Sequence, residues 1–137
     1  MQILIIDDDY LIRMMVHALF GGLGHTVIPI ATAEEAIAYG PTLKADVVLL
    51  DLDLPRMSGL EVLTSLKTCP GWERRPILML TADDSVDSLT VARRGGARGY
   101  ICKPVQPETL LSMVVDVVEQ SDLMWMDDYT RVRKSTW

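Results

Sequence analysis

Apolar residues gather in five short runs along the chain, and amphipathic segments of helical spacing follow each run. The runs occupy residues 3–6, 26–30, 47–50, 77–80 and 99–102. The third run, VVLL, is apolar without interruption, which is typical of a strand covered on both faces in a parallel sheet. The pattern therefore predicts strands and helices in alternation.

The amphipathic segments carry local signals for helix ends. Asp9 and Ser58 stand where a cap is needed, ahead of the first and third helical segments. Two glycines follow the first segment and end it. Pro107 suits the first turn of the last helix. In the helix after residues 83–85, we expect four residues to point toward the core: Val86, Leu89, Thr90 and Ala92.

The alternation predicts an α/β domain of the flavodoxin-like doubly wound class, (βα)5, with a five-stranded parallel sheet in the strand order 2-1-3-4-5. We expect residues 1–120 to form this domain and residues 121–137 a C-terminal extension. The extension is either a helical stalk that continues the last helix, or a linker stub or disordered tail. The stalk is favoured by apolar residues at helical spacing: Leu111, Val115, Val118, Trp125, Tyr129 and Val132.

Composition narrows the function classes. The chain has 137 residues, 49% of them hydrophobic, and a net charge of -6. It therefore fits one globular domain, and its acidic balance argues against direct binding of nucleic acid. Cys69 and Cys102 lack metal-ligand spacing and fit reduced thiols. No apolar run is long enough to cross a membrane and no targeting segment is visible, so we expect a cytoplasmic protein.

Polar residues of complementary chemistry follow the apolar runs. Asp7 and Asp8 come after the first run, Asp51 after the third, Thr81 after the fourth and Lys103 after the fifth. Because the carboxyl ends of parallel strands share one edge of a sheet, we expect these side chains to meet there. At neutral pH, crowded carboxylates either hold a proton or recruit a cation, and a small number of oxygen ligands favours Mg²⁺ as that cation. A lysine and a hydroxyl suit phosphoryl oxygens, which leaves Asp51 as the nucleophile that would form an acyl phosphate.

Four motifs in this order and spacing resemble the receiver domain of two-component response regulators, of the chemotaxis-regulator type. They are IIDDD at residues 5–9, LLDLDLPRMSG at residues 49–59, TA at residues 81–82 and YICKP at residues 100–104. The resemblance covers residues 1–120. It implies that Asp51 is the phosphoacceptor. It also implies that Asp7 and Asp8 hold Mg²⁺ together with Asp51 and the backbone carbonyl of Asp53.

The resemblance implies further roles around the acceptor. Lys103 would contact the phosphoryl group, and the peptide bond between Lys103 and Pro104 would be cis. Thr81 and Tyr100 would form the switch pair, in which the hydroxyl moves to a phosphoryl oxygen and the aromatic ring turns inward behind it. The phosphoryl donor would be a histidine kinase or a histidine phosphotransfer protein. The sequence does not identify the output protein or output domain.

The domain would catalyse only its own aspartyl phosphorylation and dephosphorylation, so the resemblance does not imply a metabolic enzyme. Its output would be a change on the face formed by the fourth helix, the fifth strand and the fifth helix, near Arg93 and Arg94. We also expect that the domain can form a homodimer, either through that face or through a continued C-terminal helix.

Two other functions compete with this interpretation. Asp51-Leu52-Asp53 after an apolar run also resembles the nucleophile motif of haloacid-dehalogenase-type phosphatases. In those enzymes the paired metal acids come after the nucleophile, whereas here they precede it, and the length leaves no room for a cap domain. The other alternative is a non-phosphorylated protein-interaction module on the same fold. Such a module would lack a pocket residue, and no residue of the pattern is missing.

Overall fold

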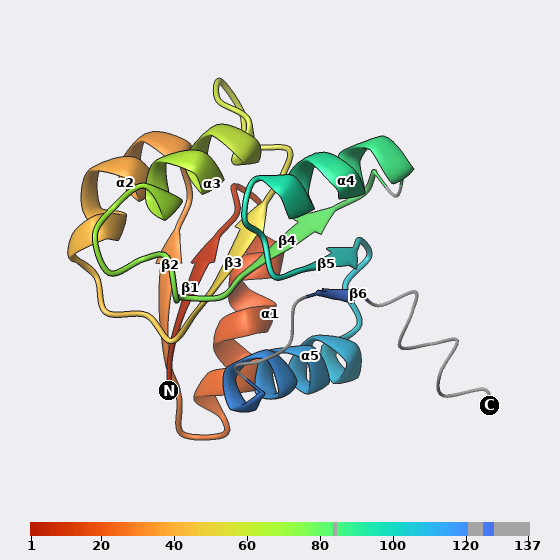
Figure 1. The fold of residues 1–137 in the computed structure, drawn as a ribbon. Helices are drawn as coiled ribbons and strands as arrows, with labels where there is room; N and C mark the ends of the chain where they lie inside the picture. Colours follow the sequence, from red (N-terminus) through yellow and green to blue (C-terminus); the bar gives the residue numbers. More distant parts are fainter. Residues whose placement is uncertain (84, 121–124, 128–137) are drawn as a thin grey trace.

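In the part of the chain that the structure describes, six parallel strands form one sheet in the order β2-β1-β3-β4-β5-β6 (Figure 1). The structure is a computed structural model that describes residues 1–83, 85–120 and 125–127, without the side chain of Met126. The first five strands have the predicted order 2-1-3-4-5, so the doubly wound fold is confirmed. The strands are β1 Gln2–Ile6, β2 Thr26–Ile30, β3 Val47–Asp51, β4 Ile77–Thr81, β5 Gly99–Cys102 and β6 Met126–Asp127.

Most of the helices begin at side-chain caps that the sequence places locally, whereas the helix that starts at Pro107 has no side-chain cap. Asp9 accepts a hydrogen bond from the Leu11 amide at the start of α1, and Ser58 accepts one from the Leu60 amide at the start of α3. Such caps satisfy backbone N–H groups that have no partner within the helix. The helices are α1 Tyr10–Gly21, α2 Ala33–Tyr39, α3 Gly59–Lys67, α4 Val86–Arg94 and α5 Pro107–Glu119, with a short 3₁₀ turn, η1, at Gly40–Thr42.

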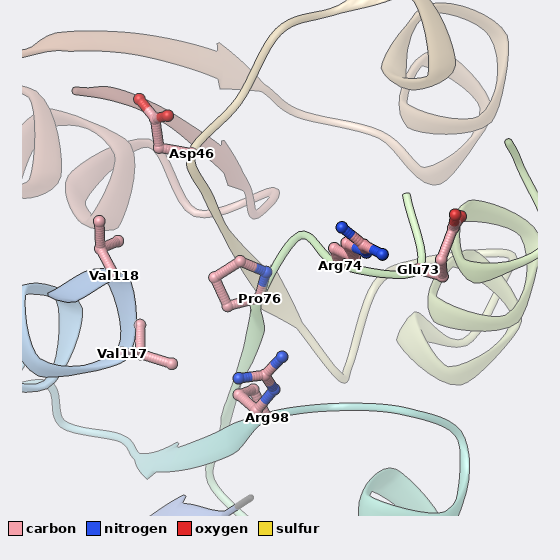
Figure 2. A pocket seen from close by; sticks show the side chains of 7 residues that line it. All are labelled: Asp46, Glu73, Arg74, Pro76, Arg98, Val117 and Val118. Atoms are coloured by element: carbon pink, nitrogen blue, oxygen red, sulfur yellow. The ribbon is translucent and has the colours of Figure 1, made fainter. Parts of the chain in front are cut away.

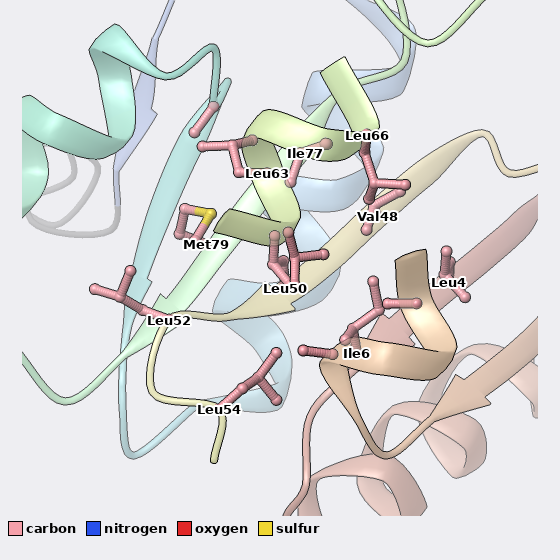
Figure 3. Packing of buried hydrophobic residues seen from close by; sticks show 14 of the residues in the cluster. Leu4, Ile6, Val48, Leu50, Leu52, Leu54, Leu63, Leu66, Ile77 and Met79 are labelled. Atoms are coloured by element: carbon pink, nitrogen blue, oxygen red, sulfur yellow. The ribbon is translucent and has the colours of Figure 1, made fainter. Parts of the chain in front are cut away.

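Alternate side chains of the central strands divide the core into two layers. One layer, which lies under α2, α3 and α4, includes Leu50 of β3 and Leu63 of α3 (Figure 3). The other lies against α1 and α5 and includes Leu49 of β3. Every residue of β3 and β4 is buried, as the uninterrupted apolar runs predict. The two layers fix the central strands, and with them the residues at the carboxyl ends of those strands.

The apolar face of α4 differs from the prediction at its first residue. Ala92 is buried and Leu89 and Thr90 are half-buried, but Val86 is 78% exposed. Val86 is the first residue of α4. The start of this helix lies beyond the carboxyl end of β4 (Figure 1). The sheet therefore ends before this turn, which is why helical spacing alone gave the wrong prediction for Val86.

The C-terminal extension also differs from both predictions where it is described. The helix α5 ends at Glu119, and residues 126–127 form β6, which pairs in parallel with β5. A helix that continues through Trp125 is therefore wrong, and so is a tail without structure at residues 126–127. The extension supplies backbone partners to an edge strand that would otherwise present unpaired groups. Tyr129 and Val132, which supported the predicted stalk, lie outside the described residues.

Candidate functional site

Two neighbouring strands bring the acids together at the carboxyl edge of the sheet. In the parallel register Ile6 of β1 lies beside Leu50 of β3, so the next residues, Asp7 and Asp51, are side by side. Asp7 and Asp51 are buried, whereas Asp8 is exposed. One carboxylate oxygen from each of the three lies within 4.8 Å of the others. The predicted acidic cluster is therefore present, and we call it the acid pocket.

Lys103 extends into the acid pocket from the end of β5. Its Nζ lies 3.0 Å from Oδ2 of Asp7 and 3.2 Å from Oδ1 of Asp51. The Lys103 amide donates to the carbonyl of Thr81 at 2.7 Å, which ties the lysine backbone to the end of β4. The peptide bond between Lys103 and Pro104 is cis. One cation therefore faces two buried carboxylates that would otherwise repel each other.

Thr81 lies at the end of β4, fully buried, and contacts the acid pocket through Asp53. Its Oγ1 donates to Oδ2 of Asp53 at 3.4 Å and accepts a hydrogen bond from the Asp83 amide at 2.9 Å. The Asp53 amide in turn donates to Oδ1 of Asp51 at 3.0 Å. The structure thus places the predicted hydroxyl next to Asp53, with Asp53 linking it to Asp51.

Tyr100 is not in the acid pocket but is linked to it through the loop after β4. The side chain is 2% exposed, and its hydroxyl donates to the backbone carbonyl of Asp83. Because the Asp83 amide donates to Thr81, the backbone of Asp83 joins the two residues of the predicted switch pair. The sequence predicted no role for Asp83 in the site, so this link was missed. Its position two residues after Thr81 was the available signal.

Burial and neighbouring charges shift the ionisation of Asp51 and Lys103. Burial raises the pKa of Asp51 to about 6 from an ordinary value of 3.8, opposed by the hydrogen bond from the Asp53 amide. The charge of Asp7 also contributes to the raised pKa, and Lys103 lowers it. Burial lowers the pKa of Lys103, but Asp7 and Asp51 together raise it above its ordinary value. At neutral pH most of Asp51 is a carboxylate beside a lysine cation.

The start of α3 packs directly against the backbone of Asp51. The Gly59 amide donates to the carbonyl of Leu52 at 2.9 Å. A Cβ added at Gly59 would lie 2.2 Å from the carbonyl oxygen of Asp51 and 2.7 Å from the Cα of Leu52. Only glycine fits this approach of helix to strand end, so Gly59 helps to set the position of Asp51.

A second hollow lies at the opposite, amino-terminal edge of the sheet (Figure 2). It is lined by Asp46, Glu73, Arg74, Pro76, Arg98, Val117 and Val118. These residues come before β3, β4 and β5 or from the end of α5, so the length of the strands separates them from the acid pocket. Charges of both signs line the hollow, which none of the residues of the acid pocket lines.

The fold and the acid pocket define a class, the flavodoxin-like domains that gather carboxylates and a lysine at the carboxyl edge of a parallel sheet. Residues 3–115 match the family described as the response regulator receiver domain. The chain belongs to this family, as the four sequence motifs predicted.

Relatives and solved structures agree with the family. The cell cycle transcriptional regulator CtrA of Caulobacter vibrioides is 30% identical over 88% of this chain and 52% of its own length. The DNA-binding response regulator MtrA of Mycobacterium tuberculosis is 33% identical over the same shares. The chemotaxis protein CheY4 of Vibrio cholerae superposes with a TM-score of 0.80 at 33% identity, over 85% of this chain and 97% of that one. The chain thus spans about half the length of these two curated relatives.

These comparisons do not favour the haloacid-dehalogenase-like phosphatase or the non-phosphorylated interaction module. Within the described residues, no helix is both long and apolar enough to cross a membrane.

Proposed function

We propose that this receiver domain accepts a phosphoryl group on Asp51, in a Mg²⁺-dependent reaction, from a histidine kinase or a histidine phosphotransfer protein. The observation that carries the proposal is the position of Asp51, which is buried between Asp7 and Lys103 at the end of β3. A carboxylate in such a place has a nucleophilic oxygen near a fixed cation. That arrangement favours transfer of a phosphoryl group from the donor to Asp51.

The residues present fit a hard divalent cation. Asp7, Asp8 and Asp51 each offer a carboxylate oxygen within one small volume. Oδ2 of Asp7 is buried and accepts no hydrogen bond from the described residues, although Lys103 lies beside it, so it has capacity for another positive partner. We propose these three carboxylates and the backbone carbonyl of Asp53 as the protein ligands. When bound, Mg²⁺ would neutralise charge on the phosphoryl oxygens.

The proposed step is a phosphoryl transfer to oxygen. A carboxylate oxygen of Asp51 forms a new bond to phosphorus, and the bond from phosphorus to the donor nitrogen of a phosphohistidine breaks. With acetyl phosphate as donor, the bond from phosphorus to the acetyl oxygen breaks and acetate leaves. Lys103 stays protonated throughout and balances the negative charge beside Asp51. The product is an aspartyl phosphate, which water later hydrolyses.

The proposed response follows the hydrogen-bond route from the acid pocket. Movement of Thr81 toward a phosphoryl oxygen would break its bond with the Asp83 amide, and Asp83 also binds the hydroxyl of Tyr100. The change would therefore reach the face formed by α4, β5 and α5, which we propose as the output surface and as a face for homodimers. The domain modifies only itself and would act in the cytoplasm, where phosphorylated kinases supply the donor.

The two regulators CtrA and MtrA are named for transcription and DNA binding, and each is about twice as long as the matched region. By analogy we propose that phosphorylation of this domain controls an output domain or a partner protein rather than nucleic acid directly. The net charge of -6 is consistent with a domain that does not itself bind nucleic acid.

Intact-mass measurement tests the proposed function. The chain is incubated with acetyl phosphate, with Mg²⁺ or with a chelator, alongside Asp51→Asn. The control is Asp9→Asn, which changes an exposed acid of the same Asp-Asp-Asp run and keeps a good cap for α1. We expect one added phosphoryl group in the wild type and the control, only with Mg²⁺, and none in Asp51→Asn. Equal uptake by Asp51→Asn would overturn the assignment.

A further inference from the structure

The strand β6 lies outside the five strands of the predicted domain and covers the first half of the outer edge of β5. Met126 lies beside Gly99, and Asp127 lies beside Tyr100, in parallel register. Asp127 is 8% exposed, although its side chain is charged. An edge strand in a parallel sheet is a ready site for the addition of another chain. Here the chain's own segment occupies that site.

A tryptophan fixes this segment against α4. The indole ring of Trp125 packs against the apolar layer under α2, α3 and α4, and the guanidinium of Arg93 lies 5.5 Å from the ring centroid. The indole N–H donates to Oδ2 of Asp127 at 3.0 Å. The ring thus contacts Arg93 of α4, and its N–H binds the carboxylate of Asp127 in β6. We call residues 125–127 the edge segment.

The edge segment is also connected to the acid pocket. Asp127 is paired with Tyr100, whose hydroxyl donates to the carbonyl of Asp83. The Asp83 amide donates to Thr81, which contacts Asp53. A change at either end of this series of contacts alters the surroundings of Tyr100. Two sites that bias the same element are coupled, and the coupling acts equally in both directions.

We propose that the edge segment is a built-in cover for the α4–β5 edge, which a partner strand has to displace, and that its docking is coupled through Tyr100 to the state of the acid pocket. The cover itself does not depend on the proposed phosphorylation, whereas the coupling rests on it. The partner it excludes is an extended segment that would add to β5 and place an aromatic ring under Arg93.

Amide hydrogen exchange of the full chain, followed residue by residue by NMR, tests the cover. Trp125→Ala and Arg93→Ala each remove one member of the cation–π pair. Arg94→Ala changes the next residue of α4, which is also exposed, and is the matched control. We expect about two- to five-fold faster exchange of edge amides in residues 99–102 for Arg93→Ala, and a larger increase for Trp125→Ala. Arg94→Ala should match the wild type. Equal exchange in all four proteins would overturn the cover.

A second comparison tests the coupling and separates it from the proposed function. Beryllofluoride with Mg²⁺, a stable stand-in for the phosphoryl group, is added to the wild type and to Trp125→Ala. We expect beryllofluoride to change the exchange rate at residues 126–127 of the wild type by a measurable factor. The affinity for beryllofluoride should differ between the two proteins by that same factor. Binding that leaves residues 126–127 and the affinity unchanged would overturn the coupling alone. No binding at all would overturn both the coupling and the proposed function, while the first comparison would still decide the cover.

Discussion

Asp51 is held in a charge environment in which opposing effects nearly balance. Burial and Asp7 favour the protonated acid, whereas the Asp53 amide and Lys103 favour the carboxylate. The result is a pKa of about 6, which leaves the group ionised at neutral pH but at a free-energy cost to the fold. A nucleophile that is ionised and incompletely compensated gains from any further positive charge in the acid pocket.

The stability of the metal-free protein should depend on the protonation of Asp51. Because the pKa is raised in the folded state, the proton stabilises the fold fully below pH 4, and this contribution is lost as the pH rises through about 6. We expect the difference in unfolding free energy between wild type and Asp51→Asn to move against the wild type by roughly 2–3 kcal/mol from pH 4 to pH 7. Urea unfolding in a chelator measures it. A constant difference across this range would contradict the pKa.

Removal of Lys103 should favour the protonated form of Asp51, because the lysine cation stabilises the carboxylate. Lys103→Met takes away the only cation within salt-bridge distance of Asp7 and Asp51 among the described residues. We expect the pKa of Asp51 to rise above about 6 and phosphoryl uptake from acetyl phosphate to slow by at least about tenfold. Carboxyl ¹³C NMR titration and intact-mass kinetics measure the two effects. The Lys67→Met variant, which changes a lysine of α3 outside the acid pocket, serves as the control.

At the scale of elements, the acid pocket depends on how closely α3 approaches the end of β3. Gly59 is the contact point, where even a methyl group would overlap the backbone of Asp51 and Leu52. Packed backbone has no room to yield, so the strand end or the helix would have to shift. The position of Asp51 is thus set by a helix start as well as by its own strand.

Gly59→Ala should therefore damage both stability and chemistry. We expect a loss of on the order of 2–4 kcal/mol in unfolding free energy, with slower phosphoryl uptake in the fraction that remains folded. Gly21→Ala is the matched control, because the nearest atom to its added Cβ is 4.0 Å away at His17. In a helix this control should be neutral or stabilising by up to about 1 kcal/mol. Similar unfolding midpoints for the two variants would refute the close-approach argument.

Elements set by local signals were predictable, and elements set by distant contacts were not. The strands that end at Asp7 and Asp51 followed from apolar runs, and the starts of α1 and α3 from caps. The two residues of β6 are too few for any periodicity, and their pairing depends on β5 and on the ring of Trp125. The link between Thr81 and Tyr100 also depends on contacts between distant residues, and the position of Asp83 two residues after Thr81 is too weak a signal to predict it.

At the scale of the whole molecule, two apolar layers support one polar edge. The helices α1 and α5 cover one face of the sheet, and α2, α3 and α4 cover the other (Figure 1). The strand ends are therefore the place where buried carboxylates can meet solvent and a cation. A ligand bound there stabilises the folded chain as a whole, because the unfolded chain has no assembled site.

Mg²⁺ should consequently raise the thermal midpoint of the chain. At a free concentration tenfold above its dissociation constant, binding adds about 1.4 kcal/mol, which corresponds to roughly 3–6 °C for a domain of this size. Asp8→Asn, which removes an exposed member of the acid pocket, should lose most of this shift, and Asp9→Asn should keep it. Calorimetry with and without Mg²⁺ measures the shift. An equal increase in Asp8→Asn would remove Asp8 from the proposed ligands.

The most direct test of the central claim is to locate the phosphoryl group on the chain. After incubation with acetyl phosphate and Mg²⁺, borohydride reduces an aspartyl phosphate to homoserine, and tandem mass spectrometry of the digested chain identifies the changed residue. We predict conversion of Asp51 alone, absent when acetyl phosphate or Mg²⁺ is omitted. Conversion at Asp7, Asp8 or Asp53 instead, or no conversion while acetyl phosphate is consumed, would contradict the assignment of Asp51 as the phosphoacceptor.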